Sequence, residues 1–335
     1  MPMIDWFNGV LPLTHTDNFI HGGSVAFYDR DGNVEYELAK PLSVAGSYDN
    51  RIQIKTYGSS KLWISGNPVK FLQGHNIFGS CDLIYLVNKL IDRLISMDIG
   101  LTPTDMELAN IRKGNYQVLR VDINQSYHLS NRDEVSAWLR AAESSARLRH
   151  RGSGIFAGNT LYYGKHSRYW ALKCYSKILE ILAKGHQLPS ELQIPELIAW
   201  AEQSLRIEAV IRSMELKRRG LNIASAWSEE SAKLLLQELI GHLEMTGSFS
   251  LPDEVAKSLP TSLKSVYELW VRGVDMQSHL KKTTFYRHRK ALLAYGIDIA
   301  VTQESARSNI VPLYRVLEAV PAEIPQWAYD KGLVA

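Results

Sequence analysis

Tyr175 and Lys177 form the residue pair in this chain that is best suited to covalent chemistry on a phosphodiester. They follow an aromatic-rich segment that begins at Thr160 and is typical of a β-hairpin whose second strand ends at Tyr175. A tyrosine on a rigid strand can act as a phenolic nucleophile, and a nearby cation can stabilise the phenolate and the phosphate. Most strand tyrosines only pack, so the surroundings must decide between the two roles. The alternative nucleophiles in the same hairpin are Tyr162, Tyr163 and Tyr169.

Three predicted strands each carry polar and charged side chains on one face, because residues two apart share a face of a strand. The three sets are Arg120, Asp122 and Asn124; Lys173, Tyr175 and Lys177; and Arg206, Glu208 and Arg212. The alternative for Lys177 is that it already belongs to the helix predicted from just after Tyr175 to near Gly185. If these strands are neighbours, two carboxylates, a tyrosine and several cations converge. Carboxylate oxygens suit Mg²⁺ or Mn²⁺, so Asp122 and Glu208 are predicted metal ligands near a phosphate that Tyr175 attacks. The alternative is that Asp122 and Glu208 form surface ion pairs with Arg120 and Arg206.

The loop around Gly74-His75-Asn76 is a second candidate site. His75 could bind a metal or orient a phosphate, and the neighbouring glycine permits close approach of a backbone. A single loop histidine is more often structural. The chain has no His-x-His pair, so a simple two-histidine metal site is excluded, and it has no Walker-type glycine loop, so it is not an obvious ATPase.

Basic residues gather in local clusters, although the net charge of the chain is only +3. Such clusters are expected of a protein that binds a phosphate backbone, whereas any one of them alone is more often a solvated helix face. The predicted DNA contacts are Arg120, Lys173 and Arg206 on the strands, then Arg147, Arg149 and Arg151, and finally Lys281, Lys282, Tyr286, Arg287, Arg289 and Lys290.

The segment 262–296 is typical of a helix-turn-helix. We expect a supporting helix over 262–272, a short second helix over 277–280, and a third helix that Thr283 or Thr284 caps. The third helix directs its basic residues and Tyr286 outward and Phe285, Leu292 and Leu293 inward. A basic helix of this kind could enter a major groove, and the alternative is a surface helix with incidental charge.

Hydrophobic periodicity predicts an α+β fold with a mostly antiparallel central sheet, helices on one face and a following helical domain. The predicted units are a catalytic domain over 1–225, a helical DNA-binding domain over 226–300 and a tail over 301–335. Predicted strands are 24–28, 34–38, 51–57, 61–65, 116–124 and 204–213, and predicted helices are 82–97, 195–203 and 227–245, with another opened by 130–133.

Two cysteines, Cys81 and Cys174, form no CxxC motif and no disulfide framework, which favours a reducing cytoplasm. We expect no signal peptide, because the first residues lack a basic region followed by an apolar run, and no transmembrane helix, because no apolar run reaches ~18 residues.

The segment Pro68-Val-Lys-Phe-Leu-Gln-Gly-His-Asn-Ile-Phe-Gly79, followed by Asp82-Leu83, resembles a signature of the filamentous-phage replication initiators of the gene II/X type. Further matches to this family are Arg120-Val-Asp122, Arg206-Ile-Glu-Ala-Val-Ile-Arg212, Asn309-Ile-Val-Pro-Leu-Tyr-Arg315 and Pro325-Gln-Trp327. The hairpin that leads to Tyr175 also resembles the motif of plasmid rolling-circle initiators of the Rep_trans type. The likeness covers most of the chain, and the Gln-Gly-His-Asn block is its most specific part.

The resemblance implies rolling-circle replication in the cytoplasm of a bacterial host. Such proteins bind double-stranded replicative-form DNA at an origin and nick one strand through a 5′-phosphotyrosine, which leaves a 3′-OH primer. They later rejoin the displaced single strand, and host helicase and polymerase are expected partners, without membrane or small-molecule substrate. In the family motif the nucleophile aligns with Tyr175 and a nearby lysine with Lys177. The family's relatives in the wider superfamily use a His-x-His pair, which this chain lacks.

A competing hypothesis is a non-catalytic DNA-binding regulator that uses the helix-turn-helix and keeps the sheet as a scaffold. Convergence of Asp122, Glu208 and Tyr175 within ~6 Å, the reach of a metal-bridged phosphate, favours the enzyme. A buried Tyr175 hydroxyl favours the regulator.

Overall fold

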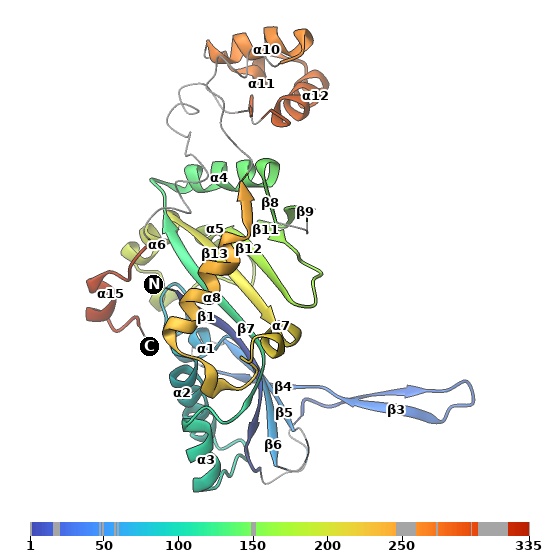
Figure 1. The fold of residues 1–335 in the computed structure, drawn as a ribbon, viewed down its shortest axis with the longest axis vertical. Coiled ribbons are helices and arrows are strands. Elements are labelled where there is room, and N and C mark those ends of the chain that lie inside the picture. The colour runs from blue at the N-terminus through green and yellow to red at the C-terminus, as the bar shows by residue number, and fades with distance from the viewer. Residues whose placement is uncertain are drawn as a thin grey trace.

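The computed structural model describes residues 2–15, 21–46, 48, 50–56, 58, 60–148, 152–245, 259–272, 274–295, 297–300 and 321–334. It confirms the predicted α+β class (Figure 1). Its centre is a nine-stranded sheet in the order β10-β11-β12-β13-β7-β1-β6-β5-β4, in which every neighbouring pair is antiparallel. The strands are β1 (Met3–Pro12), β4 (Leu42–Ala45), β5 (Arg51–Thr56), β6 (Lys61–Gly66), β7 (Gln117–His128), β10 (Ile155–Ala157), β11 (Thr160–Tyr163), β12 (Trp170–Ser176) and β13 (Ser204–Arg212).

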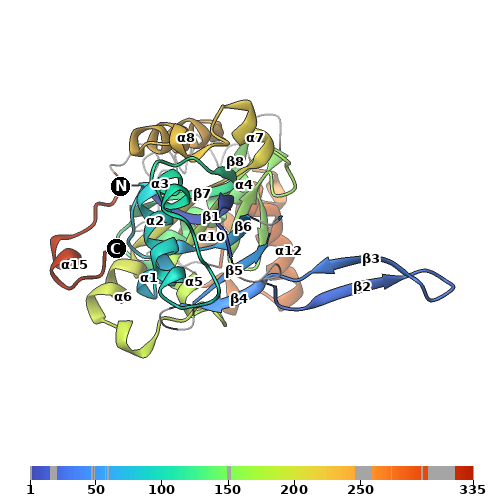
Figure 2. The same ribbon diagram turned by 90° about the horizontal axis from the view of Figure 1, so that it is seen from below.

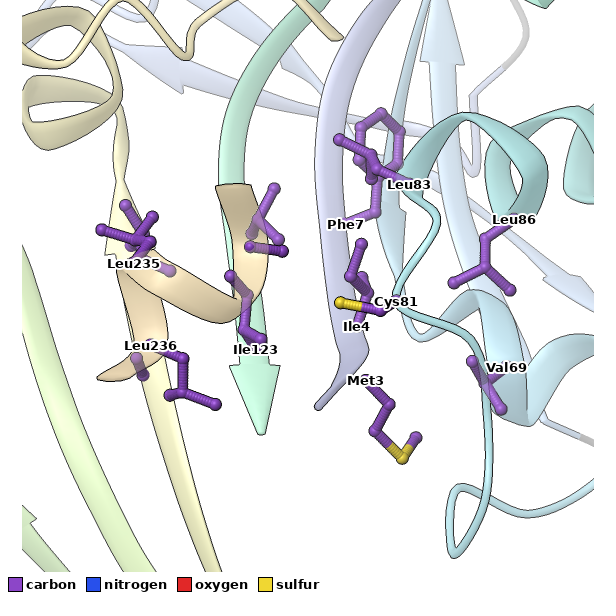
Figure 3. Packing of buried hydrophobic residues seen from close by; sticks show 14 of the residues in the cluster. Met3, Ile4, Phe7, Val69, Cys81, Leu83, Leu86, Ile123, Leu235 and Leu236 are labelled. Carbon is purple, nitrogen blue, oxygen red and sulfur yellow. The ribbon is translucent and has the colours of Figure 1, made fainter. Parts of the chain in front are cut away.

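The apolar face of this sheet packs against helices to form the main core. The helices of the sheet domain are α1 (Pro68–Gln73), α2 (Leu83–Ile95), α3 (Asp105–Arg112), α4 (Arg132–Ser145), α5 (Lys177–Leu182), α6 (Pro195–Glu202), α7 (Ser213–Arg218) and α8 (Glu229–Gly241). Figure 3 shows Ile4 and Phe7 of β1 near Leu83 and Leu86 of α2, with Leu235 of α8 on the far side of β7. The strands bury alternate residues here, so their other face is free to carry polar side chains.

Strand β1 was not predicted individually, although it lies in the middle of the sheet between β7 and β6. Its register against β7 shifts between Ile4 and Trp6, which marks a bulge at Asp5. Because a bulge re-aims a side chain, Asp5 leaves the regular alternation that sequence patterns detect.

The strands β2 (Ser24–Tyr28) and β3 (Val34–Ala39) form the predicted hairpin, which projects from the body of the molecule as an arm in both views (Figures 1 and 2). The predicted helix over 227–245 is wrong at its end. Helix α8 stops at Gly241, and β14 (Leu243–Met245) pairs with β8 (Ala146–Leu148), which also pairs with β9 (Gly152–Ser153). Pairing with another strand overrides the helical pattern there.

Three helices form a separate bundle after the sheet domain, namely α10 (Thr261–Val271), α11 (Met276–His279) and α12 (Lys282–Leu293). They enclose their own core, which includes Trp270, Phe285 and Leu292. The predicted cap of the third helix is wrong, because α12 begins before Thr283 with Lys281 as its N-cap and has no side-chain cap hydrogen bond.

The segment after the bundle returns to the sheet domain, where α15 (Gln326–Asp330) lies beside α6 (Figure 2). The aromatic rings of Trp327 and Phe78 are 5.7 Å apart, and the N–H of Ala322 donates to the carbonyl of Ser126 at 2.9 Å. The predicted match at 309–315 lies outside the described residues. No helix in the described ranges is both long and apolar enough to cross a membrane.

Candidate active site

The antiparallel register of β12, β13 and β7 brings the three predicted polar sets onto one face of the sheet. Lys173 pairs with Glu208, and Glu208 pairs with Asn124. Asp122 lies two residues from Asn124 on the same face of β7. The neighbouring strands are held by the apolar residues of the opposite face, so these side chains have fixed positions.

A compact group of five side chains results, which we call the carboxylate centre: Arg120, Asp122, Lys173, Tyr175 and Glu208. The Arg120 guanidinium donates to both carboxylate oxygens of Asp122 at 2.7 and 2.6 Å. The Lys173 ammonium lies 2.5 Å from Glu208 and 3.5 Å from Asp122. The Tyr175 hydroxyl donates to Oε2 of Glu208 at 3.0 Å. Glu208 thus links the tyrosine to the cations, and the predicted ion pair of Glu208 is with Lys173 rather than with Arg206.

Burial and neighbouring charge shift the pKa values of Glu208 and Lys173 in opposite directions, whereas both raise the pKa of Tyr175. Burial raises the pKa of Glu208, although the Lys173 ammonium favours its charged form. Burial favours the neutral form of Lys173, but Glu208 and Asp122 nevertheless raise the pKa of this lysine above its ordinary value. Burial and then the charge of Glu208 raise the pKa of Tyr175 well above its ordinary value. A phenolate at Tyr175 therefore requires that a base take its proton as it reacts.

Exposure is graded across the carboxylate centre. The side chains of Arg120 and Lys173 are 34% and 20% exposed, whereas the whole of Tyr175 is 6% exposed. A phosphate that approaches this face from solvent therefore meets the two cations before it meets the tyrosine.

The alternative tyrosines occupy different environments. Tyr162 pairs with Lys173 on the polar face and is partly exposed, and the Lys165 ammonium lies 5.1 Å from its ring centre. Tyr163 points into the core and donates to the carbonyl of Ala142 at 2.8 Å. Tyr169 is 39% exposed before the start of β12. Tyr162 is consequently the alternative that lies closest to the carboxylate centre by register.

Lys177 belongs to a second group of side chains, which we call the lysine cluster: Lys70, Asn76, Lys177, Glu180 and His186. The Lys177 ammonium donates to Oδ1 of Asn76 at 2.6 Å and to Glu180. Glu180 also contacts Lys70 at 3.2 Å and His186 at 3.3 Å. The structure therefore places Lys177 and Tyr175 in separate groups, because α5 begins at Lys177 and ends the two-residue alternation of β12.

The lysine cluster is strongly buried at its centre. Complete burial lowers the pKa of Lys177 to about 7, despite the adjacent carboxylate. Burial also disfavours the charged form of Glu180, but the Lys177 ammonium and its other partners hold the pKa of Glu180 well below its ordinary value.

His75 and Arg206 both support the loop after α1 rather than an open surface. The Arg206 guanidinium is fully buried and donates to the carbonyls of Asn76 at 2.5 Å and Ile77 at 2.8 Å. The predicted DNA contact by Arg206 is thus wrong, because the protein backbone occupies its donors. His75 is also fully buried, and its Nδ1 accepts from the N–H of Ile77 at 3.2 Å. Burial, followed by the charge of Lys177, lowers the pKa of His75 to about 4.

Comparison with known proteins finds matches to one family over both the N-terminal and the C-terminal parts of the chain. The family model described as "Replication-associated protein G2P N-terminal" matches residues 3–230, and "Replication-associated protein G2P C-terminal" matches residues 254–334. The replication-associated protein G2P of Enterobacteria phage I2-2 is 39% identical over 337 aligned positions, which cover 98% of this chain and 96% of that protein. The chain belongs to the G2P family of filamentous-phage replication-associated proteins. The G2P protein of Enterobacteria phage M13 is 26% identical over 220 positions, which cover 56% of this chain and 52% of that protein.

The G2P N-terminal match includes the whole carboxylate centre and the lysine cluster, and the C-terminal match includes the helical bundle and α15. In the bundle, α12 has no acidic residue, and Lys282, Arg287 and Lys290 are exposed. Tyr286 is 50% exposed and Lys281 lies at the N-cap. These positions are compatible with the predicted DNA contacts.

Other predicted basic contacts have mixed positions. Arg289 donates to both carboxylate oxygens of Asp298 at 2.8 and 2.9 Å, so its guanidinium is engaged within the bundle domain. Arg147 is exposed on β8 and lies 3.9 Å from Glu244. Arg149 and Arg151 lie outside the described residues.

Two residues of the site, Asp5 and Glu180, were not among those predicted from the sequence. Asp5 accepts from the side-chain amides of Asn76 at 2.6 Å and Asn67 at 2.9 Å, so it fixes the loop to β1. Glu180 pairs with Lys177 three residues earlier on α5, a spacing that could have indicated this ion pair.

The oxygen atoms near Asp122 and Glu208 fit a hard cation in part. Both side-chain polar atoms of Asn124 are buried without a hydrogen-bond partner, and Asn124 pairs with Glu208 in the sheet. Two carboxylates and an amide oxygen suit Mg²⁺ or Mn²⁺, which commonly add substrate phosphates and water. The Lys173 ammonium now lies between the carboxylates, and the described residues hold no group of three or more His, Cys, Asp or Glu side chains arranged for a metal. A cation would therefore have to displace Lys173 from the carboxylates.

Proposed function

We propose that this chain initiates rolling-circle replication of a filamentous phage by nicking one strand of replicative-form DNA at its origin and later rejoining the displaced strand. The observation that carries the proposal is the 3.0 Å hydrogen bond from Tyr175 to Glu208 beside Lys173 and Arg120. It joins a nucleophile to a base and sets both beside two cations that a phosphate would meet first. Membership of a family of replication-associated proteins supports DNA as the substrate.

In the nicking step the Tyr175 oxygen attacks the scissile phosphorus as its proton passes to Glu208. A bond forms between the tyrosine oxygen and the phosphorus, and the bond between the phosphorus and the 3′ oxygen breaks. The departing oxygen takes up a proton and becomes the 3′-OH primer. Rejoining reverses these changes with a 3′-OH of the displaced strand, so no bond energy is lost. Arg120 and Lys173 stabilise the negative charge of the phosphate in both directions.

We further propose that Mg²⁺ or Mn²⁺ binds Asp122 and Glu208, with the amide oxygen of Asn124 as a third donor. Such an ion polarises a phosphate oxygen when it is bound. Lys173 would then turn toward the DNA backbone. In the cytoplasm of the bacterial cell, a host helicase would separate the strands and a host polymerase would extend the 3′-OH.

The nicking reaction can be tested on supercoiled DNA that carries the origin of the phage. We expect the wild-type chain with Mg²⁺ or Mn²⁺ to produce nicked circles and a covalent protein–DNA adduct that survives denaturing electrophoresis. Tyr175→Phe should lose both products, and Tyr162→Phe is the matched control on the same face. If Tyr175→Phe still forms the adduct and Tyr162→Phe does not, the nucleophile is Tyr162.

Metal binding can be tested apart from activity by the electron paramagnetic resonance of Mn²⁺. The wild-type chain should reduce the signal of free Mn²⁺, and Asp122→Asn and Glu208→Gln should weaken that effect. Glu107→Gln is a matched control on α3, away from the sheet face. Equal Mn²⁺ binding by all four proteins would contradict the proposed ligands.

A second function, a non-catalytic DNA-binding regulator, is favoured by the burial of Tyr175. It would use the basic face of α12 and leave the carboxylate centre as scaffold. Tight binding to origin DNA without nicking by the wild-type chain, with either metal present, would support the regulator and contradict the nickase.

A further inference from the structure

We propose that the half of the polar sheet face formed by β1, β6 and β5 binds single-stranded DNA next to the nick. We call this surface the tryptophan face and define it by Trp6, Asn8, Gln53, Lys55, Trp63 and Ser65. The proposal rests on the proposed nickase function for its purpose, but the surface itself is argued from the side chains below.

The tryptophan face continues the carboxylate centre across the sheet without a break. Trp6 pairs with Asp122, and Asn8 pairs both with Arg120 on one side and with Ser65 on the other. Strand β5 extends the same face, because Ser65 pairs with Gln53 and Trp63 pairs with Lys55. A nucleic-acid strand that leaves the carboxylate centre across β1 therefore meets these side chains next.

Two indole rings stand on this face in defined positions. The indole N–H of Trp6 donates to the Ser65 hydroxyl at 3.2 Å, which fixes the orientation of the ring. The Arg120 guanidinium lies 5.4 Å from the ring centre of Trp6, and the Lys55 ammonium lies 5.3 Å from that of Trp63. Both tryptophans are partly exposed, whereas the alternate residues Leu62 and Ile64 are buried on the opposite face. Each ring is thus paired with a cation at a surface that solvent reaches.

The charge of this half of the sheet complements a phosphate backbone. Strands β4, β5 and β6 contain no aspartate or glutamate, and their polar face carries Arg51, Lys55 and Lys61. The acidic groups Asp122 and Glu208 lie on β7 and β13 and are already paired with cations. Strand β1 carries one acidic residue, Asp5 at the bulge, whose carboxylate accepts from the side-chain amides of Asn67 and Asn76.

Aromatic rings beside cations favour single-stranded over duplex DNA. Unpaired bases expose their faces, so they can stack on an indole while a lysine or arginine contacts the phosphates. In a duplex those base faces are covered by their neighbours, and only the backbone would reach a flat sheet surface. A nickase that rejoins a displaced strand has to hold single-stranded DNA on the face that carries its nucleophile. The tryptophan face shares this polar face with Tyr175 and begins where Trp6 pairs with Asp122.

The test is fluorescence anisotropy with the full-length chain, using a labelled oligothymidylate and a labelled duplex of unrelated sequence. We expect Trp63→Ala to weaken binding of the oligothymidylate by about tenfold or more, since stacking on one aromatic ring contributes that much. Trp63→Phe should lose less, and neither variant should change binding of the duplex. Tyr85→Ala is the matched control, because Tyr85 is 40% exposed on α2 with the Lys89 ammonium 5.6 Å from its ring centre.

The contribution of positive charge to oligothymidylate binding is measured with a separate variant. Lys55→Gln should lower the slope of log affinity against log salt by about 0.7 for the oligothymidylate, as expected when one phosphate contact is lost. This variant keeps the proposal testable if Trp63→Ala does not fold. Unchanged oligothymidylate binding in a folded Trp63→Ala variant would overturn the proposal, and so would an unchanged salt slope in Lys55→Gln. Equal losses for duplex and single strand would also overturn it and would indicate a general backbone-binding surface.

Tyr175→Phe separates this proposal from the nickase. If that variant loses nicking and still binds the oligothymidylate as the wild type does, both proposals stand. If the wild type does not nick DNA but Trp63→Ala weakens single-strand binding, the tryptophan face stands and the nickase fails.

Discussion

The carboxylate centre and the lysine cluster both hold cations against carboxylates, but they differ in access to solvent. In the carboxylate centre Arg120 and Lys173 remain partly exposed, whereas Lys177 in the lysine cluster is fully enclosed. A cation that binds substrate must stay reachable, while an enclosed cation can only hold protein groups in place. The difference leads us to expect that Lys177 holds protein groups in place, whereas the proposed nucleophile Tyr175 belongs to the group whose cations solvent can reach.

The comparison predicts its largest effect at Tyr175. Tyr175→Phe should reduce nicking by roughly a thousandfold or more, because the nucleophilic oxygen is removed. The free energy of unfolding should fall by only about 1 kcal/mol, the net contribution of a typical hydrogen bond such as that to Glu208. Nicking assays and denaturant unfolding of the same preparation measure both quantities. A large loss of stability with retained nicking would assign Tyr175 to the scaffold.

Lys177→Met should produce the opposite pattern. The change keeps most of the side-chain volume but leaves Glu180 and Asn76 without their buried ammonium partner. We expect the free energy of unfolding to fall by about 2–4 kcal/mol, since a buried ion pair has lost one member. Nicking measured well below the unfolding temperature should remain close to wild type. A folded, stable Lys177→Met variant without nicking would show that Lys177 acts on the DNA.

The pH dependence of stability tests the role of the buried His75. Its pKa is about 4 in the folded chain, below the ordinary value of 6.5, so the unfolded chain binds the proton first as the pH falls. Stability should therefore be complete above about pH 6.5 and should decrease toward pH 4, by at most about 3 kcal/mol from this group. Urea unfolding at several pH values would measure the slope. His75→Gln should flatten the curve between pH 6.5 and 4.5, and an unchanged slope would contradict the assignment.

The smallest predicted effects concern the helical bundle. Arg287 is exposed on α12, whereas Arg289 is bound to Asp298. Arg287→Gln should weaken duplex binding and lower its salt slope by about 0.9, as expected for one lost phosphate contact. Arg289→Gln should leave the slope unchanged and reduce the thermal stability of the bundle. Reversed results would place the DNA contact at Arg289.

Much of the central sheet and of its polar face could be predicted from local sequence patterns. The strands that carry Asp122 and Glu208 alternate with period two, so their polar face was visible in the sequence. The family resemblance extended that prediction to replication, and the matches to G2P proteins confirm the family. The assignment of Tyr175 as nucleophile and of Asp122 and Glu208 as metal ligands remains a prediction.

Other parts of the site could not be predicted from the alternation of polar and apolar residues along a strand. Arg206 resembles any polar-face residue of β13, yet its guanidinium reaches the carbonyls of a loop about 130 residues away in sequence. Asp5 lies at a bulge, where alternation fails. Lys177 follows the last residue of β12, and the start of α5 there turns its side chain away from the strand row. Tertiary contacts override the period of the sequence at Arg206, a bulge interrupts it at Asp5, and the start of the predicted helix ends it at Lys177.

The return of α15 to the sheet domain makes the helical bundle an insertion rather than an appendage. His75 and Phe78 of the loop after α1 contact Leu333 and Trp327, so the last described residues help to enclose that loop. Removing the chain from residue 301 onward would thus take α15 and its contacts with the loop after α1 away from the sheet domain, while the sequence of the bundle would be kept. Besides α15, an ion pair joins the sheet domain to the bundle, because the Arg140 guanidinium on α4 lies 3.9 Å from the carboxylate of Asp298. The two halves of the protein therefore cannot be separated by shortening the chain from its C-terminal end.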